Sequence, residues 1–97
     1  MAAYRLSAKA DADIDAIYEY SILNFGLATA STYVDELFAR FDLLAKNPGW
    51  GNDYTHIVPG LRRYEHTSHS IYYTRLDTGD VLIIRVLGGR QDPARHF

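Results

Sequence analysis

The second half of the chain carries six arginines, whose guanidinium groups could bind carboxylates or phosphates through paired hydrogen bonds. Arg62 and Arg63 are neighbours on a predicted strand, so their side chains should point to opposite faces of a sheet. Arg85 lies on the last predicted strand, and Arg90 and Arg95 follow it in the tail. Such a cluster at a sheet edge could stabilise phosphoryl charge or hold carboxylates, whereas the spacing alone favours a solvated rim.

Histidines and serines offer a second kind of chemistry, but their spacing does not support it. His66 and His69 flank a predicted turn without a surrounding group of acidic residues, and the chain contains no cysteine. Ser68 and Ser70 lie outside the Gly-x-Ser-x-Gly pattern of a nucleophile elbow. Neither a metal nor a cofactor is therefore expected, and the histidines should be exposed or hydrogen-bonded (His56, His66, His69 and His96).

Charge is unevenly distributed along the 97 residues, whose formal net charge is −2. Residues 1–53 carry four basic and eight acidic residues, whereas residues 54–97 carry six basic and four acidic residues. A protein that grips nucleic acid through its phosphates normally has a strong basic surplus, so direct DNA binding is not expected. The modest positive surplus of the second half instead indicates a surface that receives an acidic peptide or protein.

No segment indicates a membrane span or a targeting peptide. A spanning helix needs roughly 18 uninterrupted apolar residues, and the longest apolar runs here are far shorter, as at Val81–Ile84. The start of the chain lacks the hydrophobic stretch of a secretory signal. Because single domains cluster near about 100 to 150 residues, residues 1–97 are predicted to form one cytoplasmic domain.

Two stretches have the periodicity of amphipathic helices. The first follows Ser7, a suitable N-cap, and ends near Gly26, a suitable C-cap, after which the second begins at once and predicts an antiparallel helical hairpin. The acidic early turns of the first helix suit the helix dipole and are expected to be solvated (Asp11, Asp13 and Asp15). The two apolar stripes comprise Ala10, Ile14, Ile17, Tyr18, Ile22 and Phe25, and then Ala30, Tyr33, Val34, Leu37, Phe38, Phe41, Leu44 and Ala45.

The remainder of the chain has the composition of strands and turns. Residues 49–60 are bounded by turn-forming residues and are predicted to be a loop. Short strands are predicted at residues 4–6, 61–67, 70–76 and 81–87. The order β-α-α-β-β-β predicts an α+β fold, in which a helical hairpin packs on one face of a small antiparallel sheet.

The last predicted strand is apolar on both faces. Leu82, Ile84 and Val86 are expected to share one face, and the other is expected to carry Val81, Ile83, Arg85 and Leu87. Because the two helices can cover only one side of the sheet, the second side is expected to receive a partner.

Three segments of the sequence resemble the ParE toxins of the RelE/ParE superfamily of bacterial type II toxin–antitoxin systems. The opening, residues 4–20 (YRLSAKADADIDAIYEY), is similar to the strand and acidic helix with which the family begins. The middle, residues 59–73, is similar to the family's second and third strands. The ending, residues 84–96 (IRVLGGRQDPARH), continues the last strand into an Arg-x-Asp-Pro-Ala-Arg-like tail.

The resemblance implies a small cytoplasmic toxin that is not an enzyme and that inhibits DNA gyrase, thereby blocking replication. It also implies a co-expressed ParD-like antitoxin, with a DNA-binding ribbon-helix-helix head and a tail that wraps the toxin. We expect this tail to lay an amphipathic segment along the helical hairpin and an extended segment beside the sheet. The residues expected to contact the antitoxin or the target are Arg62, Arg63, Arg85, Arg90, Arg95 and His96.

The alternative that the resemblance leaves open is a RelE-type, ribosome-dependent mRNA endonuclease. Arg90 matches an arginine of these nucleases, while their C-terminal tyrosine falls at His96 and their mid-sheet arginine near Glu65. No lysine follows Lys46, so their assisting basic pair is missing. Many ParE members carry histidine where this chain has Gly88. A further alternative is a toxin that has lost its activity and serves only as an antitoxin-binding co-repressor.

Overall fold

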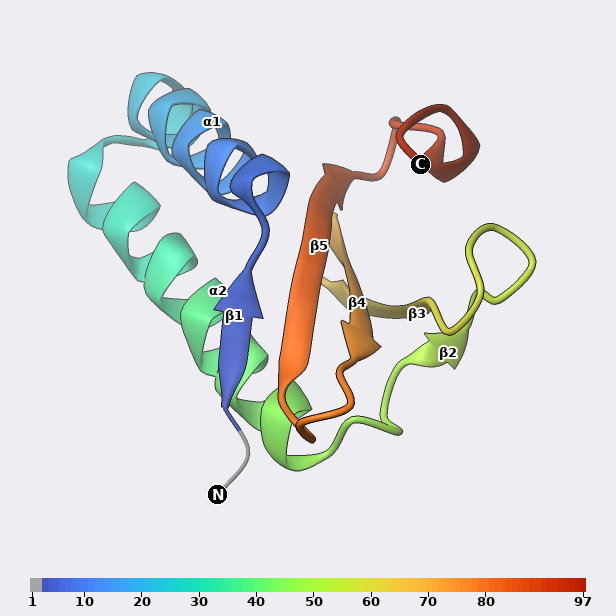
Figure 1. The fold of residues 1–97 in the computed structure, drawn as a ribbon. Helices are drawn as coiled ribbons and strands as arrows, with labels where there is room; N and C mark the ends of the chain where they lie inside the picture. Colours follow the sequence, from blue (N-terminus) through green and yellow to red (C-terminus); the bar gives the residue numbers. More distant parts are fainter. Residues whose placement is uncertain (1–2) are drawn as a thin grey trace.

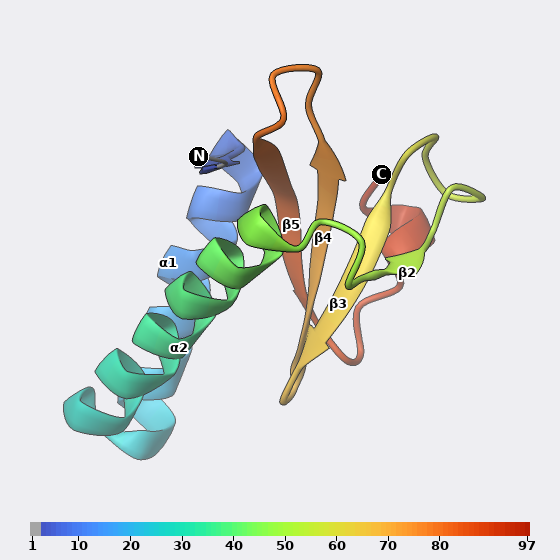
Figure 2. The ribbon, with the colours of Figure 1, turned by 90° about the horizontal axis from the view of Figure 1, so that it is seen from below.

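Two helices pack on one face of a five-stranded sheet in the computed structural model, which describes residues 3–97 (Figure 1). The elements in chain order are β1 (Tyr4–Leu6), α1 (Ala8–Phe25), α2 (Leu27–Lys46), β2 (Asn52–Asp53), β3 (Arg62–His66), β4 (His69–Arg75), β5 (Val81–Gly88) and the 3-10 helix η1 (Pro93–Arg95). Seen from below, the helices form one layer and the sheet a second, with η1 on the side of the sheet away from the helices (Figure 2). The predicted α+β fold is confirmed.

The strands lie in the order β1-β5-β4-β3-β2. The pairs from β2 to β5 are antiparallel, whereas β1 pairs with β5 in parallel. The intervening helices and strands supply the long connection that a parallel pair requires, so the sheet is mixed, whereas the sequence indicates antiparallel pairing. The short strand β2 lies within the segment predicted to be a loop. The sequence does not predict this strand, because its exposed residues Asn52 and Asp53 have little strand propensity.

Helix α1 begins and ends where the sequence predicts. The hydroxyl oxygen of Ser7 accepts a hydrogen bond from the backbone N–H of Ala10 at 3.0 Å, which satisfies one of the free donors of the first turn. At the other end Gly26 has a φ of 87°, in the left-handed region that glycine adopts without strain. The chain therefore turns directly from α1 into α2, and the two helices form the predicted hairpin.

The main core lies between the helical hairpin and the sheet. Its buried residues are Ala10, Ile14, Ile17, Leu37, Phe41, Leu44, Ile71, Tyr73, Val81, Ile83 and Val86. Phe25 is an exception to the predicted stripe, because it lies at the end of the hairpin, beyond the sheet, and is 64% exposed. Within residues 3–97, no helix combines the length and the apolar character that crossing a bilayer would demand.

A bulge in β5 reverses the predicted alternation of its side chains. Tyr72 pairs with Arg85 and Tyr73 with Ile83, so Ile84 is an extra residue without a direct partner on β4. Val86 consequently joins Ile83 in the core under the helices, while Ile84 packs on the opposite face. The expectation that Ile84 and Val86 share a face is therefore wrong, because strict alternation holds only in an uninterrupted strand.

The second face of the sheet has a small core of its own. Leu61, Tyr72 and Leu87 are buried there, and the partly buried Tyr54, Ile57, Val58 and Ile84 pack against them. Residues 54–58 belong to the long connection between β2 and β3, which folds back over this face. The apolar centre of the second face is therefore covered by the chain itself, contrary to the expectation that it needs a partner.

Candidate functional site

Three of the predicted site residues lie on the face of the sheet away from the helices. Arg63 pairs with Tyr72, and Tyr72 pairs with Arg85, so the two arginines flank one buried tyrosine across β3, β4 and β5. His96 joins them, because its ring Nδ1 lies 3.5 Å from Nη1 of Arg85. Arg62 lies opposite Tyr73, a residue of the main core, which confirms that Arg62 and Arg63 point to opposite faces.

The guanidinium of Arg63 is held by its neighbours. Its Nε donates to the hydroxyl of Ser70 at 3.0 Å, and its Nη1 donates to the hydroxyl of Tyr54 at 3.0 Å. Its Nη2 lies 2.6 Å from a carboxylate oxygen of Glu65. The guanidinium carbon also stands 5.5 Å from the centre of the Tyr54 ring, within range of a cation–π contact. Arg63 therefore helps to fasten the connection that covers the second face.

Arg85 forms a two-pronged ion pair with Asp13 of α1. Its Nε donates to Oδ2 at 2.8 Å and its Nη2 donates to Oδ1 at 2.9 Å. The backbone N–H of Val86 donates to the same carboxylate at 2.9 Å. Hydrogen bonding to Asp13 raises the pKa of Arg85, so the guanidinium remains charged under all ordinary conditions. Its positive charge is directed inward, toward the first helix.

Asp13 is a partly buried residue of this site, although its position in the acidic early turns of α1 predicts a solvated side chain. Its side chain is only 14% exposed and Arg85 is 13% exposed. A signal was present in the spacing, because Asp13 lies three residues after the buried Ala10 and four before the buried Ile17. Those spacings place Asp13 on the buried side of α1.

The remaining tail residues are directed toward solvent. Arg90 and Arg95 are exposed; Arg90 precedes Asp92, the N-cap of the short helix η1, and Arg95 is the last residue of η1. The ring of Phe97 packs edge-on against Tyr72, with 5.3 Å between the ring centres. The tail thus folds back over the second face and carries its two arginines on its outer side.

Arg62 belongs to a separate hollow at the other face. Its Nη1 donates to the carbonyl oxygen of Gly51 at 2.7 Å. Together with Arg75 it lines a shallow hollow of about 170 Å³ beside Pro48 and Gly49. The predicted arginine cluster is therefore split between two faces, with Arg63 and Arg85 on one and Arg62 on the other.

The end of the helical hairpin exposes a cluster of large apolar residues. Four side chains there are at least 60% exposed, namely Tyr20, Leu23, Phe25 and Leu27. Residues 20–34 contain no charged residue, and the hairpin extends beyond the edge of the sheet (Figure 2). We call these four residues the hairpin tip. Large apolar side chains exposed near one another in this way make the hairpin tip a candidate site of interaction.

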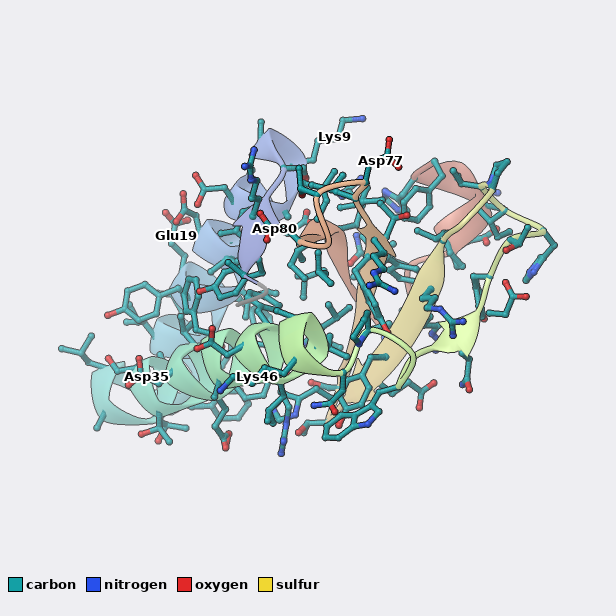
Figure 3. All side chains as sticks on the ribbon, turned by 60° about the horizontal axis from the view of Figure 1, so that its bottom comes forward. Lys9, Glu19, Asp35, Lys46, Asp77 and Asp80 are labelled. Carbon is teal, nitrogen blue, oxygen red and sulfur yellow. The ribbon has the colours of Figure 1, made fainter. Side chains whose placement is uncertain are left out.

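Charged residues surround this apolar end. Glu19 on α1 and Asp35 on α2 are exposed (Figure 3), and Asp35 lines a hollow between the two helices. The charged residues of α1 are one lysine and four acidic residues, so the helix is acidic overall. The tail of the protein, in contrast, carries Arg90 and Arg95. The surface therefore combines an apolar tip, an acidic hairpin and a basic tail.

A cavity of about 260 Å³ lies beside the hairpin tip, between the helices and the β3–β4 turn. Its lining is mostly apolar and comprises Tyr20, Ser21, Phe25, Thr29, Tyr33, Thr67, Ser68 and His69. The hydroxyl of Tyr33 is hydrogen-bonded to Nδ1 of His69 at 2.6 Å, and burial lowers the pKa of His69. His69 is thus neutral near pH 7, and the cavity presents an apolar wall with a few uncharged polar groups.

The remaining histidines do not assemble into a metal centre. Among residues 3–97, no three His, Cys, Asp or Glu side chains come together as a metal site requires. His66 receives a hydrogen bond from Nε of Arg40 at 3.4 Å, and burial, with the charge of Arg40, lowers its pKa. His56 packs against Tyr54. Both side chains therefore have structural neighbours rather than the surroundings of a catalytic base.

Comparison with known proteins agrees with the resemblance seen in the sequence. Residues 4–93 match the family described as the ParE toxin of type II toxin–antitoxin system, parDE. The chain is 38% identical to Toxin ParE1 of Caulobacter vibrioides, covering 100% of this chain and 99% of that protein. It is 32% identical to Toxin ParE1 of Mycobacterium tuberculosis (strain H37Rv), covering 97% and 96% of the two chains.

The fold gives the same result. A solved structure of the chromosomal ParDE TA system from P. aeruginosa contains a chain that matches with a TM-score of 0.74 and 26% sequence identity. The match covers 91% of this chain and 96% of that one. Sequence and fold therefore point to the same relatives over nearly the full length of the chain.

Proposed function

We propose that this chain, which belongs to the ParE toxin family of type II toxin–antitoxin systems, inhibits DNA gyrase and is neutralised by a ParD-like antitoxin. The antitoxin would carry a ribbon-helix-helix DNA-binding head, and the toxin itself would bind no DNA directly. The protein would act in the cytoplasm. The observation that best supports a protein partner is the hairpin tip, because it exposes four large apolar side chains that the fold leaves uncovered.

An amphipathic helix of the antitoxin is the partner that fits the hairpin tip. Such a helix would lay its apolar side on Leu23, Phe25 and Leu27 and so remove them from water. The absence of charge from residues 20–34 means that no ionised group has to be desolvated at this contact. The acidic sides of α1 and α2 favour basic residues at the margins of the partner helix.

An extended segment of the antitoxin would continue along the free edge of β3. Strand β2 pairs only with Arg62 and Arg63, so residues 64–66 pair on the β4 side alone within the part of the chain described. On the opposite edge, Ser7 and Asp13 bond to the backbone of β5 where β1 ends. The β3 edge is therefore the better template for an added strand.

Acidic residues of the antitoxin would meet the basic tail. Arg90 and Arg95 are exposed and available to carboxylates, and His96 lies next to them. Arg62 and Arg63 are secondary candidates, because each already donates to a group of this chain. Arg85 is occupied by Asp13 and would contribute indirectly.

We further propose that the toxin acts by binding rather than by catalysis. RNA cleavage would need an accessible general base and positive charge directed at the scissile phosphate. Here Arg63 and Arg85 face carboxylates of the same chain, and Tyr72 between them is buried. The competing RelE-type nuclease would have to use Arg90 and His96, which lie in the tail.

Two assays run in parallel on the antitoxin-free protein test the target. Plasmid supercoiling by purified gyrase should be lost or end in trapped cleavage complexes, while mRNA in translating ribosomes stays intact. Cut mRNA with normal supercoiling would establish the nuclease instead. If neither assay changed, and expression without antitoxin left growth unaffected, the chain would be an inactive co-repressor.

A pair of matched variants tests the antitoxin surface. Leu23→Ser with Phe25→Ser should weaken antitoxin binding at least tenfold in calorimetry. The control is Trp50→Ser, which removes an apolar residue 52% exposed in the loop after α2. Because α2 has 20 residues, its two ends lie about 30 Å apart, so the control should bind normally. Equal affinity of the tip variant and wild type would exclude the tip as the docking site.

A further inference from the structure

One edge of β5 is hydrogen-bonded to strand β1 along its first half and to two side chains along its second half. Strand β1 pairs with Val81, Leu82 and Ile83 and then ends. Beyond that point the hydroxyl of Ser7 donates to the carbonyl oxygen of Ile84 at 2.6 Å, and Asp13 accepts from the N–H of Val86 at 2.9 Å. The side chains of Ser7, the N-cap of α1, and Asp13 therefore bond to backbone groups of β5 that lie beyond the end of β1.

Asp13 also fixes the direction of Arg85. The Nε and Nη2 atoms of Arg85 are both bonded to the two carboxylate oxygens, which leaves Nη1 as the free end of the fork. This Nη1 lies 3.5 Å from the carbonyl oxygen of His96 and 3.5 Å from its ring Nδ1. A planar guanidinium held at two corners can present its third nitrogen in only one direction, and His96 lies in that direction.

A second contact holds the same segment. Phe97 packs against Tyr72 with ring centres 5.3 Å apart. Between β5 and these two anchors, Gln91 is hydrogen-bonded to Gly88 and Asp92 caps η1. The backbone N–H of Gly89 also donates to the carbonyl oxygen of Ser68 at 3.2 Å. We call residues 89–97 the strap. It is attached to the second face of the sheet at its end, and most of its residues are exposed.

We propose that Asp13 is a positioning residue for the strap, acting through Arg85 on His96. A change at α1 thereby alters the position of Arg90 and Arg95, which lie in the strap. The link to antitoxin binding rests on the proposed function, because that proposal assigns Arg90 and Arg95 to the antitoxin contact. The positioning itself depends only on the contacts within the chain.

The rate of limited trypsin digestion reports how firmly the strap is held, because trypsin cuts after Arg90 and Arg95. Asp13→Asn keeps an oxygen that accepts from Val86 but removes the charge that orients Arg85. We expect strap cleavage at least tenfold faster, with no new cleavage after Arg40 or Lys46, where cutting would report loss of the whole fold. Asp11→Asn, an exposed acid on the same helix, is the control and should leave the rate unchanged.

A second variant keeps the test decisive if Asp13→Asn unfolds. Arg85→Lys retains the charge that Asp13 needs but has no third nitrogen to reach His96, so it should also free the strap. An unchanged rate of strap cleavage in folded Asp13→Asn or Arg85→Lys would overturn the proposal. Cleavage that rises equally at all sites would also overturn it, because Asp13 would then act on the fold and not on the strap.

Antitoxin affinity separates this inference from the proposed function. If Asp13→Asn frees the strap and also weakens antitoxin binding, both are supported. If the strap is freed while the affinity is unchanged, the positioning role stands and the assignment of Arg90 and Arg95 to the antitoxin contact fails. Arg90→Glu with Arg95→Glu then checks that assignment alone, with Arg75→Glu, an exposed arginine at the end of β4, as control.

Discussion

The hydroxyl group of Tyr73 lies directly against the backbone of Gly51. It accepts a hydrogen bond from the Gly51 N–H at 2.7 Å and donates to the carbonyl oxygen of Pro48 at 2.9 Å. One side chain of β4 thereby holds the loop that leads from α2 to β2. A Cβ atom added to Gly51 would lie 2.5 Å from this hydroxyl oxygen, which is closer than real atoms approach.

Gly51→Ala should therefore destabilise the protein by about 1 to 3 kcal/mol, the usual cost of overpacking a buried contact. Urea unfolding followed by circular dichroism measures this free energy. Gly49→Ala in the same loop is the matched control, because its Cβ would meet no atom within 4 Å. Similar stabilities of the two variants would contradict the close packing of Tyr73 on Gly51.

Ser7→Ala is expected to cost about 1 to 2 kcal/mol of unfolding free energy. The Ser7 hydroxyl accepts from the Ala10 N–H and donates to the carbonyl oxygen of Ile84, so two backbone groups lose a partner. Thermal and urea denaturation provide the measurement. Ser7→Thr, which keeps the hydroxyl, should recover most of the loss; if it does not, the hydrogen bonds are not the cause.

Stability should fall as the pH is lowered from about 7.5 to 5, because the fold favours the neutral forms of His66 and His69. Burial lowers the pKa of each below the usual 6.5, and Arg40 lowers that of His66 further. Tyr33 and Glu36 are the other titratable groups facing them from α2. In this range the unfolded chain binds more protons than the native one, so the free energy of unfolding decreases with falling pH.

The measurement is the urea unfolding free energy at pH 7.5 and pH 5.5. A variant with His66→Gln and His69→Gln should show a smaller difference between the two values than wild type. His56→Gln is the control, since His56 is exposed. An equal pH dependence in the double variant and wild type would show that other groups are responsible.

Replacing Leu23 by serine should leave the stability of the isolated protein within about 0.5 kcal/mol of wild type. Its side chain is 86% exposed at the hairpin tip, so little apolar area is lost from the core. Leu37→Ala, a fully buried residue of α2, should in contrast cost about 2 to 5 kcal/mol. A large loss of stability at Leu23 would mean that the tip packs within the protein.

The sequence was sufficient for the elements that depend on local pattern. The caps at Ser7 and Gly26, the helical hairpin and the three antiparallel strands follow from spacing and turn residues within a few positions of each other. The opposite directions of Arg62 and Arg63 also follow, because strand alternation is local.

Features that depend on distant residues could not be predicted in the same way. The bulge at Ile84 is defined by the register between β4 and β5, which are separate in sequence. It turns the side chain of Val86 toward the helices. The bond between Asp13 and Arg85 joins residues 72 positions apart, so composition suggested only an acidic helix and a basic tail. The strap is likewise defined by a contact, between Phe97 and Tyr72, that no periodicity indicates.

The parallel pairing of β1 with β5 has a consequence for synthesis on the ribosome. Ser7 and Ile84, which are hydrogen-bonded beside this pair of strands, are 77 positions apart. Strand β1 therefore cannot join the sheet until β5 has been synthesised. Until β5 emerges, α1 lacks most of the sheet surface on which it packs, and the nascent chain exposes its apolar hairpin. At about 5 to 20 residues per second, this interval lasts seconds. A partner that binds the exposed hairpin, such as the antitoxin proposed above, can therefore meet the chain before it has folded.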